Sequence, residues 1–360
     1  MVQSNGLKIF IIIITIIIVF SFACSNSDNK KNNNEPKNAT YIGNSSCKDC
    51  HKAIYNNFVK SGHNFIQNRI NYGNPQIYPY SEIPKPPAEY AWDDILYVIG
   101  GYGWKAIFIN KKGYIITGDS AQYNLETGAF TSYFSEYTEK KYDCGNCHTT
   151  GYKNDGTFDN LPGISGSWAE DNITCERCHG KASLHAEKPD EFKLTKNGSI
   201  ESCGECHSRN NGKNIKVQEG FISNHQQYEE ILAGAHHNYD CITCHDPHIS
   251  TKYSTKESIK KPCGDCHPDK KINIDKMSAL SCKICHMPYA GKSAIKKNNY
   301  EGDLRTHIFI INVDSTANMF YDSGGNTYSH GFLTLDFVCL RCHLNKTRQW
   351  ASSTSINIHQ

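Results

Sequence analysis

The chain has 360 residues, which is enough for one large domain or two ordinary ones. Its formal net charge is only +2, so the composition gives no electrostatic support for a nucleic-acid partner. The chain also holds 17 Cys and 17 His, and the way these residues are spaced determines its class.

The N-terminal segment predicts export. Residues 10–23 are almost entirely apolar, a length that is short for a membrane span and typical of a secretory signal, so we assign residues 1–23 to a signal peptide. Ala23 followed by Cys24 resembles a lipobox, in which the Cys is lipidated and becomes the mature N-terminus. An uncleaved anchor with an incidental Cys24 is the alternative. Both interpretations export the chain and tether it to a membrane.

The next segments are a tether, a first module and a β-rich insert. Residues 24–40 are polar and cannot bury enough surface to fold, which predicts a flexible lipidated tether. In the first module, residues 41–90, apolar residues recur at helical spacing over 47–67, and a Pro-rich stretch follows. Residues 91–143 hold short β-branched and aromatic runs with a turn at 110–113, which predict a small antiparallel sheet.

The rest of the chain is divided by closely spaced Cys and His residues. Residues 144–290 are predicted to form a six-site core, in which each segment has room for one helix and a connection. Residues 291–360 form a C-terminal segment with a predicted turn at 323–326. Because aliphatic residues are sparse outside the N-terminal segment, we expect a mainly α and irregular fold whose core is filled by bound cofactors.

Sixteen of the 17 Cys fall into eight CxxCH motifs, and only Cys24 is left over. The motif residues are Cys47, Cys50 and His51; Cys144, Cys147 and His148; Cys175, Cys178 and His179; Cys203, Cys206 and His207; Cys241, Cys244 and His245; Cys263, Cys266 and His267; Cys282, Cys285 and His286; Cys339, Cys342 and His343.

The CxxCH spacing predicts covalently bound haem c. The two thiols lie on one side of a helical turn, where each can add to a haem vinyl group, and the His that follows supplies the proximal ligand to iron. Disulfides and zinc sites do not require a His after every second Cys. We therefore expect eight covalent haems, attached outside the cytoplasm.

The remaining nine His are candidates for the second axial position of the eight irons. Bis-His coordination at every haem is thus arithmetically possible, and six-coordinate iron favours electron transfer over catalysis. The candidate ligands are His63, His185, His225, His236, His237, His248, His307 and His330, whereas His359 is expected to be an ordinary surface residue.

Three of these candidates lie so close to a proximal His that they must reach a different haem. His248 follows His245 by three residues and His185 follows His179 by six. His63 lies twelve residues after His51, which we expect to place it about three turns along the same helix. The side chains of the adjacent His236 and His237 diverge, so we expect one of them to be a ligand.

Several segments resemble known multihaem cytochromes. Residues 46–63, with a CxxCH followed by a helix ending at His63, resemble the haem module of the cytochrome c-554 type. The segment from Cys175 to His185 is similar to the CxxCHGPGSxH segments of large multihaem cytochromes, with Lys181 and Ala182 in place of Pro and Gly. The resemblance covers most of residues 41–345 and extends to the superfamily of hydroxylamine oxidoreductases and pentahaem nitrite reductases. Many nitrite-reducing members carry CxxCK, which this chain lacks.

The sequence favours an electron-transfer protein with eight mostly bis-His haems, anchored by lipid and facing the periplasm or cell surface. Its expected partners are other cytochromes or a quinol-oxidising complex. A nucleic-acid partner is not expected. The alternative is an octahaem oxidoreductase that acts on a small nitrogen or sulfur compound at one five-coordinate haem. A structural cytochrome that polymerises into filaments is a third possibility.

Overall fold

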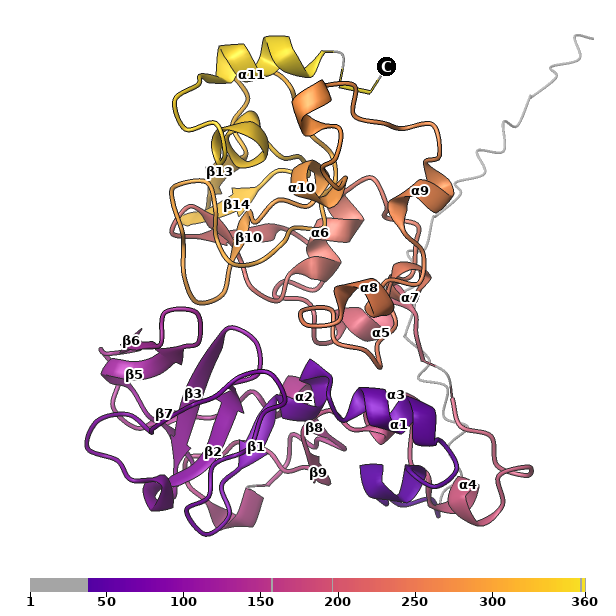
Figure 1. The fold of residues 1–360 in the computed structure, drawn as a ribbon. Helices are drawn as coiled ribbons and strands as arrows, with labels where there is room; N and C mark the ends of the chain where they lie inside the picture. The colour runs from indigo at the N-terminus through magenta and orange to yellow at the C-terminus, as the bar shows by residue number, and fades with distance from the viewer. Residues whose placement is uncertain (1–37, 157, 196, 357, 360) are drawn as a thin grey trace, which may run out of the picture. The chain divides into compact units, whose positions relative to one another are not determined.

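The computed structural model describes residues 38–156, 158–195, 197–356 and 358–359. The predicted signal peptide, Cys24 and most of the predicted tether therefore lie outside the described residues. Figure 1 shows a mixed architecture of short helices and small sheets. No helix in the part of the chain that the structure describes is long and apolar enough to cross a membrane.

The first sheet lies mainly in the predicted insert. Its strands are β1 (Gln67–Arg69), β2 (Ile95–Gly100), β3 (Lys105–Asn110), β4 (Tyr114–Ile115), β5 (Gly118–Asn124), β6 (Ala129–Tyr133) and β7 (Lys140–Lys141). The order is β1-β2-β3-β4-β7, with β5 paired to β3 and β6, and all pairs are antiparallel. The predicted turn is present, since the Gly113 N–H donates to the Asn110 carbonyl at 2.9 Å. The antiparallel insert is confirmed, and β1 extends it beyond residues 91–143.

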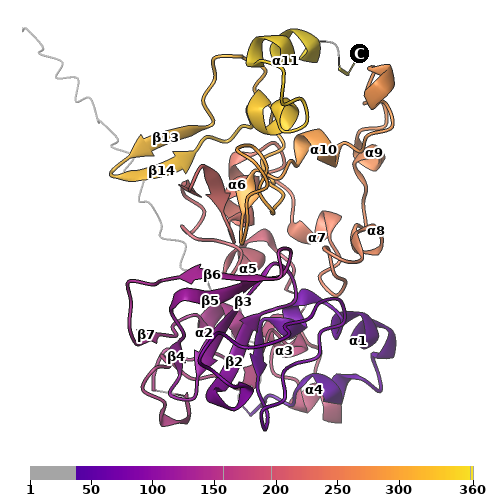
Figure 2. The ribbon, with the colours of Figure 1, turned by 60° about the vertical axis from the view of Figure 1, so that its left-hand side comes forward.

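A second sheet lies in the C-terminal half, where the sequence showed no β pattern. Its strands are β10 (Ile215–Gln218), β11 (Phe221–Ser223), β12 (Gly291–Lys292), β13 (Phe320–Ser323) and β14 (Asn326–Ser329), in the order β12-β11-β10-β14-β13. β11 and β12 run parallel. The predicted turn joins β13 to β14 through Gly324 and Gly325, both with positive φ, and Figure 2 shows this hairpin projecting from its neighbours. The expected fold, mainly α and irregular with a small sheet in residues 91–143, therefore did not include this second sheet.

The α-helices are short, and most of them carry or flank a CxxCH motif. They are α1 (Lys52–Phe58), α2 (Gly145–His148), α3 (Cys175–His179), α4 (Ser183–Glu187), α5 (Ile200–Gly204), α6 (Gln227–Ala233), α7 (Cys241–Cys244), α8 (Thr255–Ser258), α9 (Cys263–Cys266), α10 (Lys283–His286) and α11 (Arg348–Ser355). A two-stranded sheet of β8 (Thr149–Thr150) and β9 (Glu170–Asp171) lies between α2 and α3 in the chain. A π-helical turn, Asp336–Leu340, leads into the last motif.

The helix predicted over residues 47–67 is much shorter than expected. A 3₁₀ turn covers Asn44–Cys47, α1 ends at Phe58, and a second 3₁₀ turn covers Gly62–Phe65. Ser61 lies in an extended conformation before this turn. His63 therefore does not continue the helical face of His51, and the sequence prediction of three continuous turns was wrong.

Apolar packing is uneven along the chain. The first sheet packs Val98, Phe108 and Tyr123 with Phe65 and Ile83 in one cluster, and the second sheet has its own cluster around Phe221 and Leu333. By contrast, the described residues of the segment around α9 and α10 are almost all exposed or half-buried. The expectation that cofactors must supply the core thus fits this segment, whereas the sheets have conventional apolar cores.

Removing the Phe108 ring should destabilise the first sheet. Phe108 is 0% exposed, and truncation of a buried aromatic leaves a cavity that typically costs about 3–5 kcal/mol. We expect Phe108→Ala to lower the free energy of unfolding by that amount, measured by circular dichroism in guanidinium chloride. Tyr72→Ala is the control, because Tyr72 is 99% exposed; equal losses in both variants would contradict the packing described here.

Candidate functional site

Each CxxCH motif folds into a single turn that groups its functional side chains. In six motifs the His backbone N–H donates to the carbonyl of the first Cys at 2.9–3.0 Å; these His are His51, His207, His245, His267, His286 and His343. His148 and His179 end the helices α2 and α3 of their own motifs. The sixteen motif thiols, all of them in the described residues, are free and none is fully buried. This arrangement suits thioether attachment of haem c.

Six proximal His rings face a second His ring at a narrow range of centroid distances. The pairs are His51 with His185 at 6.3 Å, His179 with His248 at 6.3 Å, His207 with His63 at 6.2 Å, His245 with His307 at 6.2 Å, His267 with His236 at 6.1 Å, and His286 with His359 at 5.8 Å. The two members of each pair come from different segments of the chain.

The spacing of these rings fits two imidazoles on opposite sides of one iron. Iron–nitrogen bonds of about 2 Å place the two ligand nitrogens about 4 Å apart and the ring centroids about 6 Å apart. In the most closely spaced pair, the Nε2 atoms of His286 and His359 are 3.5 Å apart. The donor set and its spacing therefore fit bis-His haem c.

Burial keeps several of these rings in the neutral form that binds iron. It lowers the pKa of His63 to about 4, and the positive charge of His207 adds to this effect. Burial likewise lowers the pKa of His148 to about 4 and that of His307 to about 3. These imidazoles accordingly stay uncharged at neutral pH.

Four of the spare His differ in their surroundings. His236 faces His267, whereas His237 directs its Nδ1 to the Gly234 carbonyl at 3.4 Å, in agreement with the divergence expected for adjacent residues. His330 packs between Tyr321 and Phe332, with ring centroids 4.6 and 5.2 Å away, and no proximal His is among its ring contacts in the described residues. His359, expected to be an ordinary surface residue, faces His286 instead.

Two proximal His have no histidine ring opposite them among the ring contacts of the described residues. His343 lies against Trp350, with ring centroids 4.9 Å apart. His148 contacts the ring of Tyr142 at 6.2 Å. The ring centroids of His225 and His207 are 6.4 Å apart. Burial lowers the pKa of His225, and Arg209, His207 and His148 act in the same direction, so His225 lies near the sites of both His207 and His148. Bis-His coordination at every haem therefore does not follow from the structure.

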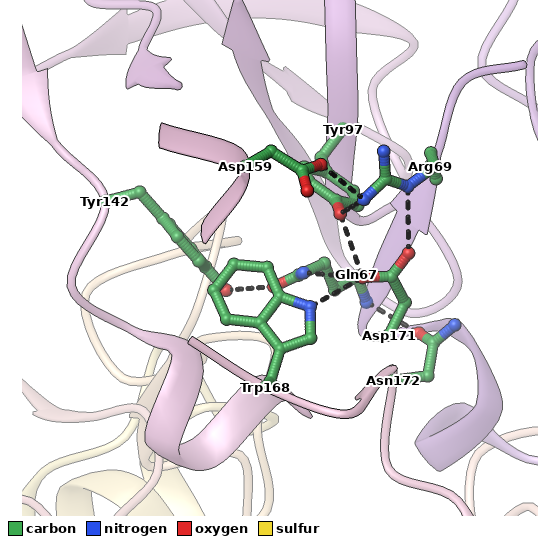
Figure 3. A network of polar contacts seen from close by, with 8 residues as sticks. All are labelled: Gln67, Arg69, Tyr97, Tyr142, Asp159, Trp168, Asp171 and Asn172. Carbon is green, nitrogen blue, oxygen red and sulfur yellow. Dashed lines mark hydrogen bonds and ion pairs between the residues drawn. The ribbon is translucent and has the colours of Figure 1, made fainter. Parts of the chain in front are cut away.

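A partly buried polar network is centred on Asp171 (Figure 3), and its member Tyr142 contacts His148. The Asp171 carboxylate accepts hydrogen bonds from the Tyr97 hydroxyl at 2.9 Å, the Trp168 indole at 2.8 Å, and Arg69 and Gln67 at 3.2 Å each. These four donors fix the carboxylate between β1, β2 and β9. The network thus links the first sheet to the segment that holds the motif of His148.

The same network determines which nitrogen of His148 is free. Because the Gln67 amide nitrogen donates to Asp171, its oxygen accepts the Tyr142 hydroxyl proton at 2.5 Å. The Tyr142 oxygen is then an acceptor for the Nδ1–H of His148, 3.1 Å away. Nε2 is left unprotonated and available to iron. Tyr142 and Gln67 belong to no sequence motif, so neither could be identified from the sequence.

The motif thiols form a connected series through the molecule. Four pairs from different motifs lie within hydrogen-bonding reach: Cys47 with Cys175, Cys147 with Cys206, Cys203 with Cys241, and Cys263 with Cys282. Electrostatic interactions between further thiols extend the series: Cys178 with Cys203, Cys244 with Cys266, and Cys285 with Cys342. All eight motifs are joined in this way, and the motif of Cys203 has three neighbours.

Comparison with known proteins agrees with this chemistry. The family described as "Cytochrome c554 and c-prime" matches residues 118–180, and that described as "Doubled CXXCH motif" matches residues 235–272. The first match covers two of the motifs but not residues 46–63, where the resemblance to this family was seen. Together with the motif turns and ligand spacing, these matches define the chain as a multihaem c-type cytochrome that binds haem c.

Among known proteins, the dissimilatory sulfite reductase MccA of Wolinella succinogenes is 28% identical over 255 residues, 59% of this chain and 31% of that protein. The crystal structure of the outer cell wall cytochrome OcwA aligns with a TM-score of 0.59 and 16% identity, over 87% of this chain and 86% of the other. The octahaem MccA structure aligns with a TM-score of 0.61 and 19% identity, over 84% and 65%. The chain spans about a third of the curated relative's length, and the structural likeness shows a shared fold.

The two adjacent His residues provide a matched test of the ligand geometry. We expect His236→Gly to convert one low-spin haem to high-spin, because His236 faces His267, while His237→Gly leaves the spin state unchanged. Electron paramagnetic resonance of the oxidised proteins measures both, and added imidazole should restore the low-spin signal in His236→Gly. A high-spin haem in His237→Gly instead would reverse the assignment.

Proposed function

We propose that the chain is an electron-transfer protein that holds eight haems in a connected series. When bound, each haem supplies one-electron redox chemistry, and the protein supplies spacing, axial ligands and shielding from water. The connection of all eight motifs through neighbouring thiols is the observation that carries this proposal. The six facing His pairs support it, because iron bound on both sides has no position for a substrate.

We further propose that Cys24 anchors the exported chain to a membrane, and that its partners are other cytochromes or a quinol-oxidising complex. The apolar segment 10–23 and the Ala23–Cys24 junction support the anchor. OcwA, which shares the fold, is described as an outer cell wall cytochrome, and this agrees with export.

A second candidate function centres on the site of His148. No His ring faces His148 among the ring contacts of the described residues, and the charge of Arg209 acts on both His148 and His225. Lys105 is nearby as well: its ammonium group donates to the Ser293 carbonyl at 2.7 Å, its charge acts on His225, and burial lowers its pKa to about 8. Cationic side chains around an open haem would suit a small nitrogen or sulfur oxyanion, and MccA is described as a sulfite reductase.

The haem count and the series can be tested together. The mass of the mature protein should exceed that of the polypeptide by eight haem masses, and full reduction should take up eight electrons. Replacing Cys203 and Cys206 with Ser interrupts the series at its branch point, so stopped-flow oxidation by a monohaem cytochrome c should divide into a fast and a slow phase. Loss of the last site, by replacing Cys339 and Cys342, should leave one phase. A single phase in both variants would contradict a series organised around Cys203.

The second candidate function predicts an anion-sensitive high-spin haem in the wild-type protein. Sulfite or nitrite should perturb that signal, and Arg209→Gln should weaken anion binding about tenfold or more, because a charge-assisted hydrogen bond is worth about 1.5–3 kcal/mol. Lys193→Gln removes an exposed charge elsewhere and should have no effect. If every haem is low-spin and indifferent to these anions, the second function is excluded and the carrier proposal stands.

A further inference from the structure

The His rings that face each other differ in what their Nδ1 atoms contact. Most of those with a hydrogen-bond partner face a backbone carbonyl: His179 with Thr195 at 2.7 Å, His185 with Phe192 at 2.8 Å, His286 with Phe309 at 2.9 Å, His359 with Lys271 at 3.1 Å and His63 with Pro247 at 3.4 Å. A neutral carbonyl is an ordinary partner for a metal-bound imidazole. These rings provide the reference for the exceptions.

His248 is the exception at one extreme. Its Nδ1 lies 2.8 Å from the Asp246 carboxylate, the one carboxylate among the hydrogen-bond partners of the histidine rings in the described residues. The same carboxylate oxygen accepts the His248 backbone N–H at 3.0 Å. Asp246 is itself fixed, because its N–H donates to the Ser258 carbonyl at 2.8 Å and its carbonyl accepts the Ile249 N–H at 3.2 Å. The carboxylate is therefore held against the ring by a short turn.

The pair His245 and His307 is the opposite extreme. Both Nδ1 atoms are buried, and neither has a hydrogen-bond partner in the part of the chain that the structure describes. The rings are 6.2 Å apart. The segment Cys-His-Asp-Pro-His, residues 244–248, thus contributes to two sites. His245, whose Nδ1 has no partner, belongs to one of them, and His248, whose Nδ1 contacts the Asp246 carboxylate, belongs to the other.

An imidazole that donates to a carboxylate becomes a stronger electron donor to iron, which stabilises the ferric state and lowers the reduction potential. An imidazole without an acceptor donates less, and its iron is reduced more readily. We propose that Asp246 acts as a positioning residue that makes the His179–His248 site the one of lowest potential among the six paired sites, and that the His245–His307 site has the highest. This inference rests on the proposed haem series and assigns an order of potentials within it.

Solvent limits how far Asp246 lowers the reduction potential of this site. The side chains of His248 and Asp246 are 32% and 31% exposed, so water screens part of the carboxylate charge. We expect Asp246→Asn, which keeps the shape and an acceptor for the backbone N–H but loses the charge, to favour reduction of one haem by about tenfold. For a one-electron couple this corresponds to about 59 mV.

A potentiometric titration followed by electron paramagnetic resonance tests the proposal on the intact holoprotein. The rings of His179 and His248 are nearly parallel, at 5°, so their haem should give a rhombic low-spin signal. In Asp246→Asn the midpoint of one rhombic signal should rise and its g-anisotropy should increase, with the other signals unchanged. Asp246→Glu, which keeps the carboxylate, should return the signal toward that of the wild type.

Asp265→Asn is the matched control, because it removes an exposed carboxylate inside another CxxCH motif. It should leave every g-value unchanged. The proposal is overturned if Asp246→Asn changes neither the midpoint nor the g-values, or if it produces a high-spin haem, which would make Asp246 a requirement for ligation. Failure of the proposed series would be visible beforehand, as missing haems or missing low-spin signals in the wild-type protein.

Discussion

The structure depends on one local constraint, the turn that brings the proximal His back over the first Cys of its motif. A backbone hydrogen bond of 2.9–3.0 Å closes this turn in six motifs, and short helices form the others. A turn of this length presents two thiols and one imidazole, but it cannot supply a second imidazole to the same iron. A second axial ligand would have to come from another segment, and the six facing His pairs do join different segments of the chain.

The two sheets supply apolar cores beside the CxxCH motifs, which bury little surface themselves. The first sheet reaches the C-terminal half through hydrogen bonds from Trp104 to the Asp303 carbonyl at 2.9 Å and from Lys105 to the Ser293 carbonyl. It also supports His148 through Gln67 and Tyr142. The segment around α9 and α10 lies outside both sheets, and the rings that face its proximal His residues, those of His236 and His359, come from elsewhere in the chain. Apolar packing thus stabilises the two sheets, whereas the segment around α9 and α10 would depend on haem ligation.

The sequence predicted the cofactor chemistry better than the geometry around it. The CxxCH spacing is a local property, so it identified the class of protein and the residues that form the motif turns, and the β-branched runs after Asp94 identified the insert. The second sheet was missed because its strands are two to four residues long and pair segments that are far apart in the chain. His330 and His359 could not be distinguished in sequence: Tyr321 and Phe332 enclose one, whereas the other is held toward His286 by the Lys271 carbonyl.

The separation of paired ligands along the chain has a consequence for how the protein matures. Under the proposed export, which would deliver the chain from its N-terminus, the motif of His51 would emerge well before His185, and that of His286 before His359. A haem attached to the first motif would keep one open axial face until more than a hundred further residues had crossed the membrane. In that interval a water molecule or an external ligand could occupy the vacant position. The protein would therefore pass through a reactive, high-spin stage during biogenesis, and the arrival of each distal His would end it.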